Sequence, residues 1–116
     1  MIKDDILRDK SYKFSLRIIK LNKFLQEKSE FVLSKQVLKS GTAIGAMVSE
    51  SKYAQSKLDF INKLSIALKE ANETKYWIDL LVDSEYITKQ MYDSINPDIE
   101  ELLRLLISSI NTLKNS

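Results

Sequence analysis

The stretch that decides the fold spans residues 57–82, KLDFINKLSIALKEANETKYWIDLLV. Its apolar and small residues recur at alternating steps of four and three residues, at Phe60, Leu64, Ala67, Ala71, Thr74, Ile78 and Leu81. This spacing follows one face of an α-helix, whereas the side chains of a β-strand alternate every two residues. Residues 57–82 are therefore predicted to form one long amphipathic helix.

Three further segments repeat the pattern, at residues 4–28, 31–54 and 88–113. Their predicted core positions are Leu7, Phe14, Ile18, Leu21, Leu25, Val37, Gly41, Ile44, Val48, Tyr92, Ile95, Ile99, Leu102, Leu106, Ser109 and Leu113. Short polar breaks at residues 27–30, 55–56 and 83–85 separate the segments, and helices with such short connections pack antiparallel to their neighbours. The chain is thus predicted to be one all-α domain, residues 1–116, folded as an antiparallel up-down-up-down four-helix bundle.

The last segment contains Pro97, and a proline inside a helix normally kinks or restarts it, at a cost of about 3 kcal/mol. Asn96 and Pro97 are followed by acidic residues, a pattern that is also typical of the start of a helix. The fourth element is therefore either one kinked helix or a short helix followed by a long one.

The second segment carries two glycines four residues apart, Gly41 and Gly45, which lie on the same face of a helix. Each costs about 1 kcal/mol relative to alanine in a helix interior, so a compensating contact is expected. We interpret the pair as the place where another helix backbone approaches closely. Ala67 and Ala71, which are small and central in the third segment, are the predicted partners.

The composition excludes several classes of site. The chain has no cysteine and no histidine, so it offers no disulfide, no thiolate ligand and no imidazole base. The Glu-x-x-His motif of di-iron bundles is also absent. An all-carboxylate metal site at Glu70 and Glu73 is the remaining alternative, and surface ion pairing is the simpler interpretation of these acids. No catalytic residue, metal or cofactor is therefore expected, and the protein is predicted not to be an enzyme.

No signal-peptide pattern and no uninterrupted apolar stretch near 18 residues occurs in the sequence. The expected location is therefore the cytoplasm, and no membrane partner is expected.

The net charge of +2 conceals a segregation of charge along the chain. Residues 1–57 carry 12 Lys or Arg and 6 Asp or Glu, a charge of +6, while residues 58–116 carry 6 and 10, a charge of −4. A basic stripe follows the first helix, and a shorter basic ridge follows the second. The candidate nucleic-acid-binding residues are Lys10, Lys13, Arg17, Lys20, Lys35 and Lys39. Such a stripe suits contact with phosphates, although a solvated helix face is the simpler explanation for four cations alone.

Apolar residues exceed what one small bundle core can hold. The surplus comprises Leu16, Ile19, Leu68, Tyr76, Trp77 and a wide arc of the last helix, Leu102, Leu103, Leu105, Leu106, Ile107 and Ile110. A homo-oligomer is the expected consequence, the alternative being that some of these residues are singly exposed.

Two stretches resemble a known family. The first is Leu33-Ser34-Lys35-Gln36 with Ser40-Gly41-Thr42-Ala43-Ile44-Gly45-Ala46, and the second runs through Lys63-Leu64-Ser65-Ile66-Ala67 to Tyr76-Trp77-Ile78-Asp79-Leu80-Leu81. They are similar to the four-helix-bundle proteins encoded by intervening sequences in bacterial 23S ribosomal RNA genes. That family includes the accessory variability proteins of diversity-generating retroelements. The resemblance implies a ring-shaped homo-oligomer, usually a pentamer, and for the retroelement branch it implies nucleic acid and a reverse transcriptase as partners.

Two functions follow as hypotheses. The first is a homo-oligomeric protein that binds RNA or DNA phosphates through its basic helix face. The second is a protein-interaction scaffold with no affinity for nucleic acid, for example a partner of a reverse transcriptase.

Overall fold

The computed structural model describes the backbone from residue 2 to residue 116 and the side chains from residue 6 onward. Four helices make up this part of the chain: α1 (Ile2–Glu27), α2 (Leu33–Ser51), α3 (Lys57–Asp83) and α4 (Lys89–Lys114). Their ends lie within three residues of the predicted ones, and no strand occurs among the described residues.

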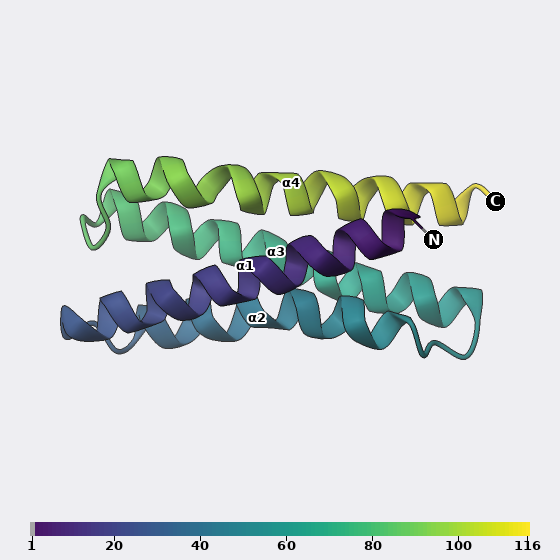
Figure 1. Cartoon of the computed structure of the whole chain (residues 1–116), viewed down its shortest axis with the longest axis horizontal. Helices are drawn as coiled ribbons and strands as arrows, with labels where there is room; N and C mark the ends of the chain where they lie inside the picture. The colour runs from purple at the N-terminus through teal and green to yellow at the C-terminus, as the bar shows by residue number, and fades with distance from the viewer. Residues whose placement is uncertain (1) are drawn as a thin grey trace.

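The helices form an elongated bundle of 46 × 21 × 19 Å in which the chain reverses direction at each connection (Figure 1). Helix α1 contacts α2, α2 contacts α3 and α3 contacts α4, while α1 and α4 are in looser contact and the diagonal pairs do not meet. Each helix therefore has two neighbours, and the predicted all-α four-helix bundle is confirmed.

The core consists of the stripes that the helical periodicity predicts. Every predicted position of α1 and α2 is buried, as are six of the seven predicted positions of α3. Half-buried positions are confined to the ends of the stripes, at Phe60, Tyr92, Ser109 and Leu113. Burial of this apolar surface is the main force that stabilises the fold.

Two of the three turns end a helix in the same way. Ser29 and Glu85 adopt positive φ angles of 61° and 66°. The next amide in each turn donates to the carbonyl five residues earlier, Glu30 to Leu25 at 2.8 Å and Tyr86 to Leu81 at 2.9 Å. This is the Schellman arrangement, and it is usually made with glycine. The chain has only two glycines and uses neither of them here.

Pro97 lies inside α4, which continues without a break from Lys89 to Lys114. The alternative of two separate helices is therefore wrong. Both Pro97 and Asp93 are exposed, so the carbonyl of Asp93 that loses its helical partner lies on the solvent side.

The nearest neighbours of the two glycines of α2 lie on α1, whereas Ala67 and Ala71 of α3 were the expected partners. A Cβ added to Gly41 would lie 2.8 Å from Ile18 Cγ1, and one added to Gly45 would lie 3.2 Å from the carbonyl oxygen of Ser11. Ala67 and Ala71 are fully buried in the core from α3. The glycines therefore allow α1 and α2 to pack closely.

Candidate functional site

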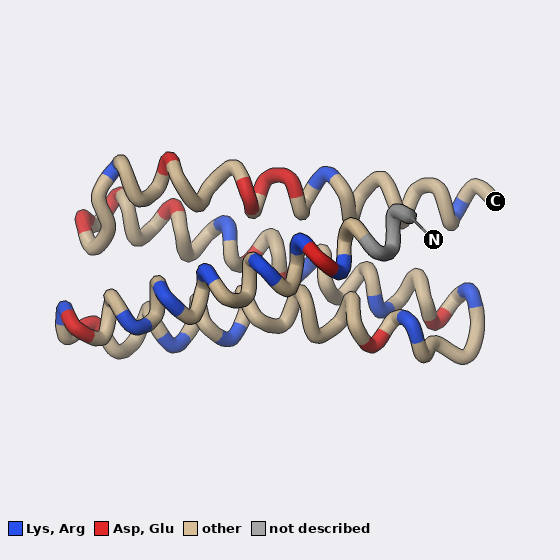
Figure 2. The backbone as a smooth tube through the Cα atoms, viewed as in Figure 1, with Lys and Arg blue, Asp and Glu red and all other residues tan. Residues whose placement is uncertain are grey.

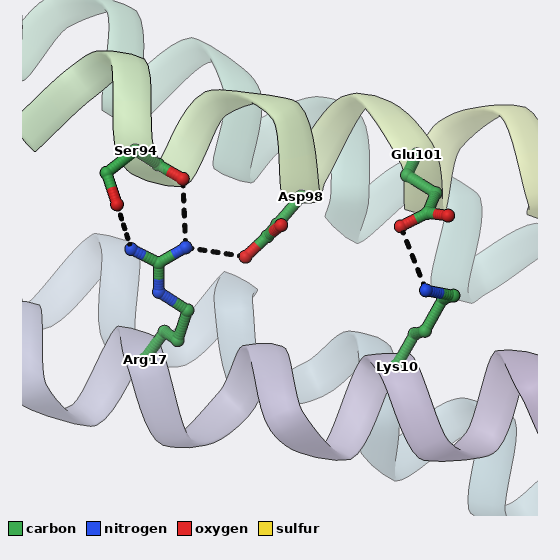
Figure 3. A network of polar contacts seen from close by, with 5 residues as sticks. All are labelled: Lys10, Arg17, Ser94, Asp98 and Glu101. Carbon is green, nitrogen blue, oxygen red and sulfur yellow. Dashed lines mark hydrogen bonds and ion pairs between the residues drawn. The ribbon is translucent and has the colours of Figure 1, made fainter.

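Arg17, in the centre of the predicted basic stripe, binds α4 across the bundle. Its Nη1 donates to Asp98 Oδ2 at 2.6 Å and to the carbonyl oxygen of Ser94 at 2.9 Å, and its Nη2 donates to Ser94 Oγ at 2.6 Å (Figure 3). Because these three bonds join helices 77 to 81 residues apart in sequence, Arg17 fixes α1 against α4.

Two other stripe residues are also paired. Lys10 Nζ lies 3.3 Å from Glu101 Oε1 of α4, and this ion pair is the second contact drawn in Figure 3. Lys13 lies 3.0 Å from Asp9 on its own helix. The acids of α4 therefore neutralise part of the stripe, and three of its four cations already have an anionic partner.

The remaining candidate cations form no ion pair or side-chain hydrogen bond among the side chains that the structure describes. They are Lys20 of α1 and Lys35 and Lys39 of α2, and all three are exposed. Figure 2 shows Lys and Arg following α1, while acidic residues gather in the middle of α4. The available positive charge thus lies in the half of α1 and α2 nearest their connecting turn.

A polar cluster joins α3 to α4. Lys75 Nζ donates to Asp79 Oδ1 at 2.8 Å, to Tyr92 Oη at 2.8 Å and to Asn96 Oδ1 at 2.7 Å, and Tyr92 Oη donates to Asp79 Oδ1 at 2.6 Å. The sequence indicated ion pairing for the acids of α3, and Lys75 lies four residues before Asp79, but the contribution of Tyr92 and Asn96 from α4 was missed.

The pKa shifts of the cluster indicate a structural role. Burial opposes the charge on both Lys75 and Asp79, but their mutual hydrogen bond and those to Tyr92 prevail, so the pKa of Lys75 is raised and that of Asp79 is lowered. The hydrogen bond to Asp79 raises the pKa of Tyr92. Each group is therefore held in its ordinary charge state at neutral pH, the opposite of what acid–base catalysis requires.

Glu70 and Glu73, the two acids of the alternative all-carboxylate metal site, are both half-buried on α3. Glu73 Oε2 accepts a hydrogen bond from Trp77 Nε1 at 3.2 Å. Among the described side chains, no group of three His, Cys, Asp or Glu residues is placed to hold a metal ion.

A row of exposed apolar side chains faces outward from α1. Tyr12, Leu16 and Ile19 follow one side of this helix, and their exposed fractions are 65%, 49% and 38%. Beside them lies a groove of about 770 Å³, lined on the α2 side by Thr42, Gly45, Ala46 and Ser49. We call these α1 side chains together with the groove the α1–α2 surface. The sequence identified Leu16 and Ile19 as surplus apolar residues, but it did not indicate that Thr42, Ala46 and Ser49 of α2 line a groove beside them.

The other predicted surplus apolar residues divide between core and surface. Leu102, Leu106 and Ile110 are buried, Leu68, Trp77, Leu103 and Leu105 are half-buried, and Tyr76 and Ile107 are exposed. The α4 arc is therefore largely internal. Within the described residues, none of the helices has a stretch that is both long and apolar enough to cross a membrane.

Comparisons with known proteins agree with this fold. Over residues 3–108 the sequence matches the family described as 23S rRNA-intervening sequence protein. A crystal structure from Bacteroides thetaiotaomicron, described as a protein with unknown function from the S23 ribosomal protein family, is 58% identical in sequence with a TM-score of 0.92. That match covers 94% of this chain and 98% of the other.

No curated protein matches the sequence. The resemblance drawn from residues 31–82 is confirmed, and the matching family is not a known enzyme family. The chain belongs to the 23S rRNA-intervening sequence protein family.

Proposed function

We propose that the protein is a non-enzymatic scaffold that assembles with copies of itself through the α1–α2 surface. The observation that carries this proposal is the exposure of Tyr12, Leu16 and Ile19 side by side on one helix. Single exposed apolar residues are common on soluble proteins, but a contiguous row beside a groove is typical of an interaction site.

The groove supports a helix as the contacting element. Small side chains at Thr42, Gly45 and Ala46 let a second helix approach closely, as the two glycines of α2 do for the α1–α2 packing inside the chain. Assembly as a closed ring of five copies is part of the proposal, because the family resemblance implies it. A closed ring leaves no apolar surface unpaired at its ends.

The test is the molar mass in solution, measured by light scattering over a range of protein concentrations. The proposal expects a mass near five times the 13.4 kDa of one chain. Leu16→Lys places a charge in the contact and is expected to lower the mass while the far-UV circular dichroism stays helical. Ile107→Lys is the matched control, because Ile107 is 47% exposed on α4, away from this surface. A monomeric parent, or an equal loss of mass in both variants, would refute the proposal.

Binding of RNA or DNA phosphates is the second candidate function. The observation that favours it is the set of exposed lysines without an anionic partner among the described side chains, Lys20, Lys35 and Lys39. A ring would repeat these charges around its axis and raise the local positive potential. Lys10 and Arg17 contribute less in this proposal, because Glu101 and Asp98 already pair with them.

The experiment is fluorescence anisotropy of a labelled RNA duplex at low and physiological salt. Changing Lys20, Lys35 and Lys39 together to glutamate is expected to abolish binding. The control changes Lys69, Lys89 and Lys114 on α3 and α4 to glutamate, which alters the net charge equally and is expected to retain binding. Equal loss in both triple variants, or binding that does not weaken with salt, would contradict phosphate contact at the predicted lysines.

A further inference from the structure

The seam between α1 and α4 contains a groove that self-association through the α1–α2 surface does not use. These two helices are the most loosely packed of the four neighbouring pairs. In Figure 1 they lie close together where both termini are found and far apart near the α3–α4 turn. Where they separate, a cavity of about 370 Å³ opens. That volume is within the range of small-molecule sites, which in bundles lie between helices.

The body of the groove is mostly apolar, although Gln90 of α4 also lines it. Leu21 and Phe24 of α1 form one wall, and Met91 and Ile95 of α4 form the other, with Ile87 of the preceding turn at the far end. Phe24 and Met91 are only half-buried, so their apolar surface remains open to a ligand. From Arg17 to Phe24 the groove follows α1 for about 10 Å, at 1.5 Å per helical residue, which suits an extended molecule of about ten carbon atoms.

The other end of the groove is polar and positively charged. Arg17 and Lys20 line it, and no acidic residue is among the described residues that do. Three of the five N–H bonds of the Arg17 guanidinium are used by Ser94 and Asp98. The Nε–H and one Nη2–H of Arg17 have no partner among the described residues. The ammonium of Lys20 adds three more donors, and no acidic side chain among the described residues pairs with it.

Because Asp98 shares the charge of Arg17, Lys20 supplies the uncompensated positive charge of this end. A ligand that fits both ends therefore needs an anionic head and an apolar tail. The contact of Arg17 with Ser94 also closes the seam at the polar end, so a partner helix lying along it would have to break three hydrogen bonds. A small molecule whose head stops at Arg17 breaks none of them.

We propose that the α1–α4 groove binds a small amphiphilic carboxylate, with the carboxylate at Arg17 and Lys20 and an unbranched apolar tail between Phe24 and Met91. Binding requires no covalent step and does not depend on the assembly of copies.

The test uses the full chain labelled with ¹³C at its methionine methyl groups and titrated with decanoate below its micelle-forming concentration. The chain has three methionines, so few signals arise. Met91 reports on the groove, and Met47, half-buried on α2, is an internal control. The expected result is a saturable shift of the Met91 signal with no shift of Met47. Affinity should fall about fourfold for each methylene removed from the tail, as apolar burial predicts.

Two variants test the charged end. Lys20→Gln is expected to weaken decanoate binding by about threefold to tenfold, in line with loss of one charge-assisted contact. Lys23→Gln makes the same change one helical turn away, outside the groove lining, and is expected to change the affinity less than twofold. Decanol, which has the tail without the charge, should bind more weakly than decanoate.

Three outcomes would overturn the proposal. The first is an equal, non-saturating shift of Met91 and Met47, which indicates detergent-like adsorption. The second is unchanged affinity in Lys20→Gln. The third is a Met91 signal that responds to protein concentration and not to decanoate, which indicates that a second copy of the chain covers the groove.

Discussion

Replacing Gly41 by alanine tests the close packing of α1 on α2. The new Cβ would lie 2.8 Å from Ile18 Cγ1, 2.9 Å from Cγ2 and 3.2 Å from Cδ1. Ile18 is 0% exposed and is branched at Cβ, so it has one preferred rotamer in a helix and no free space to enter. Relief therefore requires α1 and α2 to move apart.

Two opposing terms set the size of the effect. Alanine is favoured over glycine inside a helix by about 1 kcal/mol. Overpacking a closed core costs about 1–3 kcal/mol. Because the new Cβ crowds three atoms of the stiff Ile18 side chain, we expect Gly41→Ala to lie in the upper part of that range. The expected net loss in the free energy of unfolding is about 1–2 kcal/mol. For a chain of this length that corresponds to a Tm lower by about 4–8 °C.

The assay is urea unfolding followed by far-UV circular dichroism, at one fixed protein concentration because self-association adds to apparent stability. Gly45→Ala is the matched control. The Cβ added at position 45 would lie 3.2 Å from both the carbonyl oxygen of Ser11 and Ser15 Oγ. Gly45→Ala should therefore lower the free energy of unfolding less than Gly41→Ala does. In a double-mutant cycle, the variant with both Ile18→Ala and Gly41→Ala should lose less free energy of unfolding than the sum of the losses in the two single variants. A Gly41→Ala chain as stable as the parent would refute the close packing of α1 on α2.

Three further predictions concern the contacts between helices and the turns. Arg17→Ala removes the hydrogen bonds of Arg17 to Ser94 and Asp98 of α4. Because the Arg17–Asp98 pair is partly exposed, the free energy of unfolding in urea should fall by only about 1 kcal/mol. An unchanged free energy of unfolding would contradict the idea that Arg17 fixes α1 against α4. Ser29→Gly and Glu85→Gly relieve positive φ angles, so each should raise the free energy of unfolding by about 0.5–1 kcal/mol, and a loss of stability in either would be inconsistent with the Schellman turns. The pKa of Asp79 is lower in the folded chain than its unfolded value of 3.8. Its pairing with Lys75 therefore stabilises the fold fully above pH 3.8, and this stabilisation is lost as the pH falls through the lower pKa of the folded chain. The free energy of unfolding of the parent should therefore exceed that of Asp79→Asn at neutral pH, and the difference should shrink below pH 3.8. A difference that stays constant as the pH is lowered would exclude the ion pair as its cause.

The bundle could be predicted because helical periodicity decides which residues are buried. The repeat from Leu64 to Leu81 has no other period that fits it, and the same holds for the stripe from Phe14 to Leu25. Burial follows from such local spacing. The order of contacts between helices does not, which is why the glycines of α2 were expected to meet α3, whereas Gly41 lies against Ile18 of α1 and Gly45 lies against Ser11 and Ser15 of α1.

The electrostatic surface was harder to predict for the same reason. Four cations at helical spacing on α1 form a stripe in the sequence, but ion pairing depends on which helix lies opposite. Asp98 and Glu101 are distant in the chain and become partners of Arg17 and Lys10 only when α4 closes the bundle. The cluster around Lys75 likewise needs Tyr92 and Asn96 from another helix.

The central claim, that a second copy covers the α1–α2 surface, is tested most directly by the reactivity of a single introduced thiol. The parent chain has no cysteine, so Ala46→Cys in the groove and Ser108→Cys on exposed α4 each carry one thiol. Their rates of modification by a thiol reagent are compared at high and low protein concentration. The account predicts that the thiol at position 46 reacts far more slowly at high concentration and recovers on dilution, while the thiol at position 108 reacts rapidly throughout. Equal rates at both positions and both concentrations would contradict it.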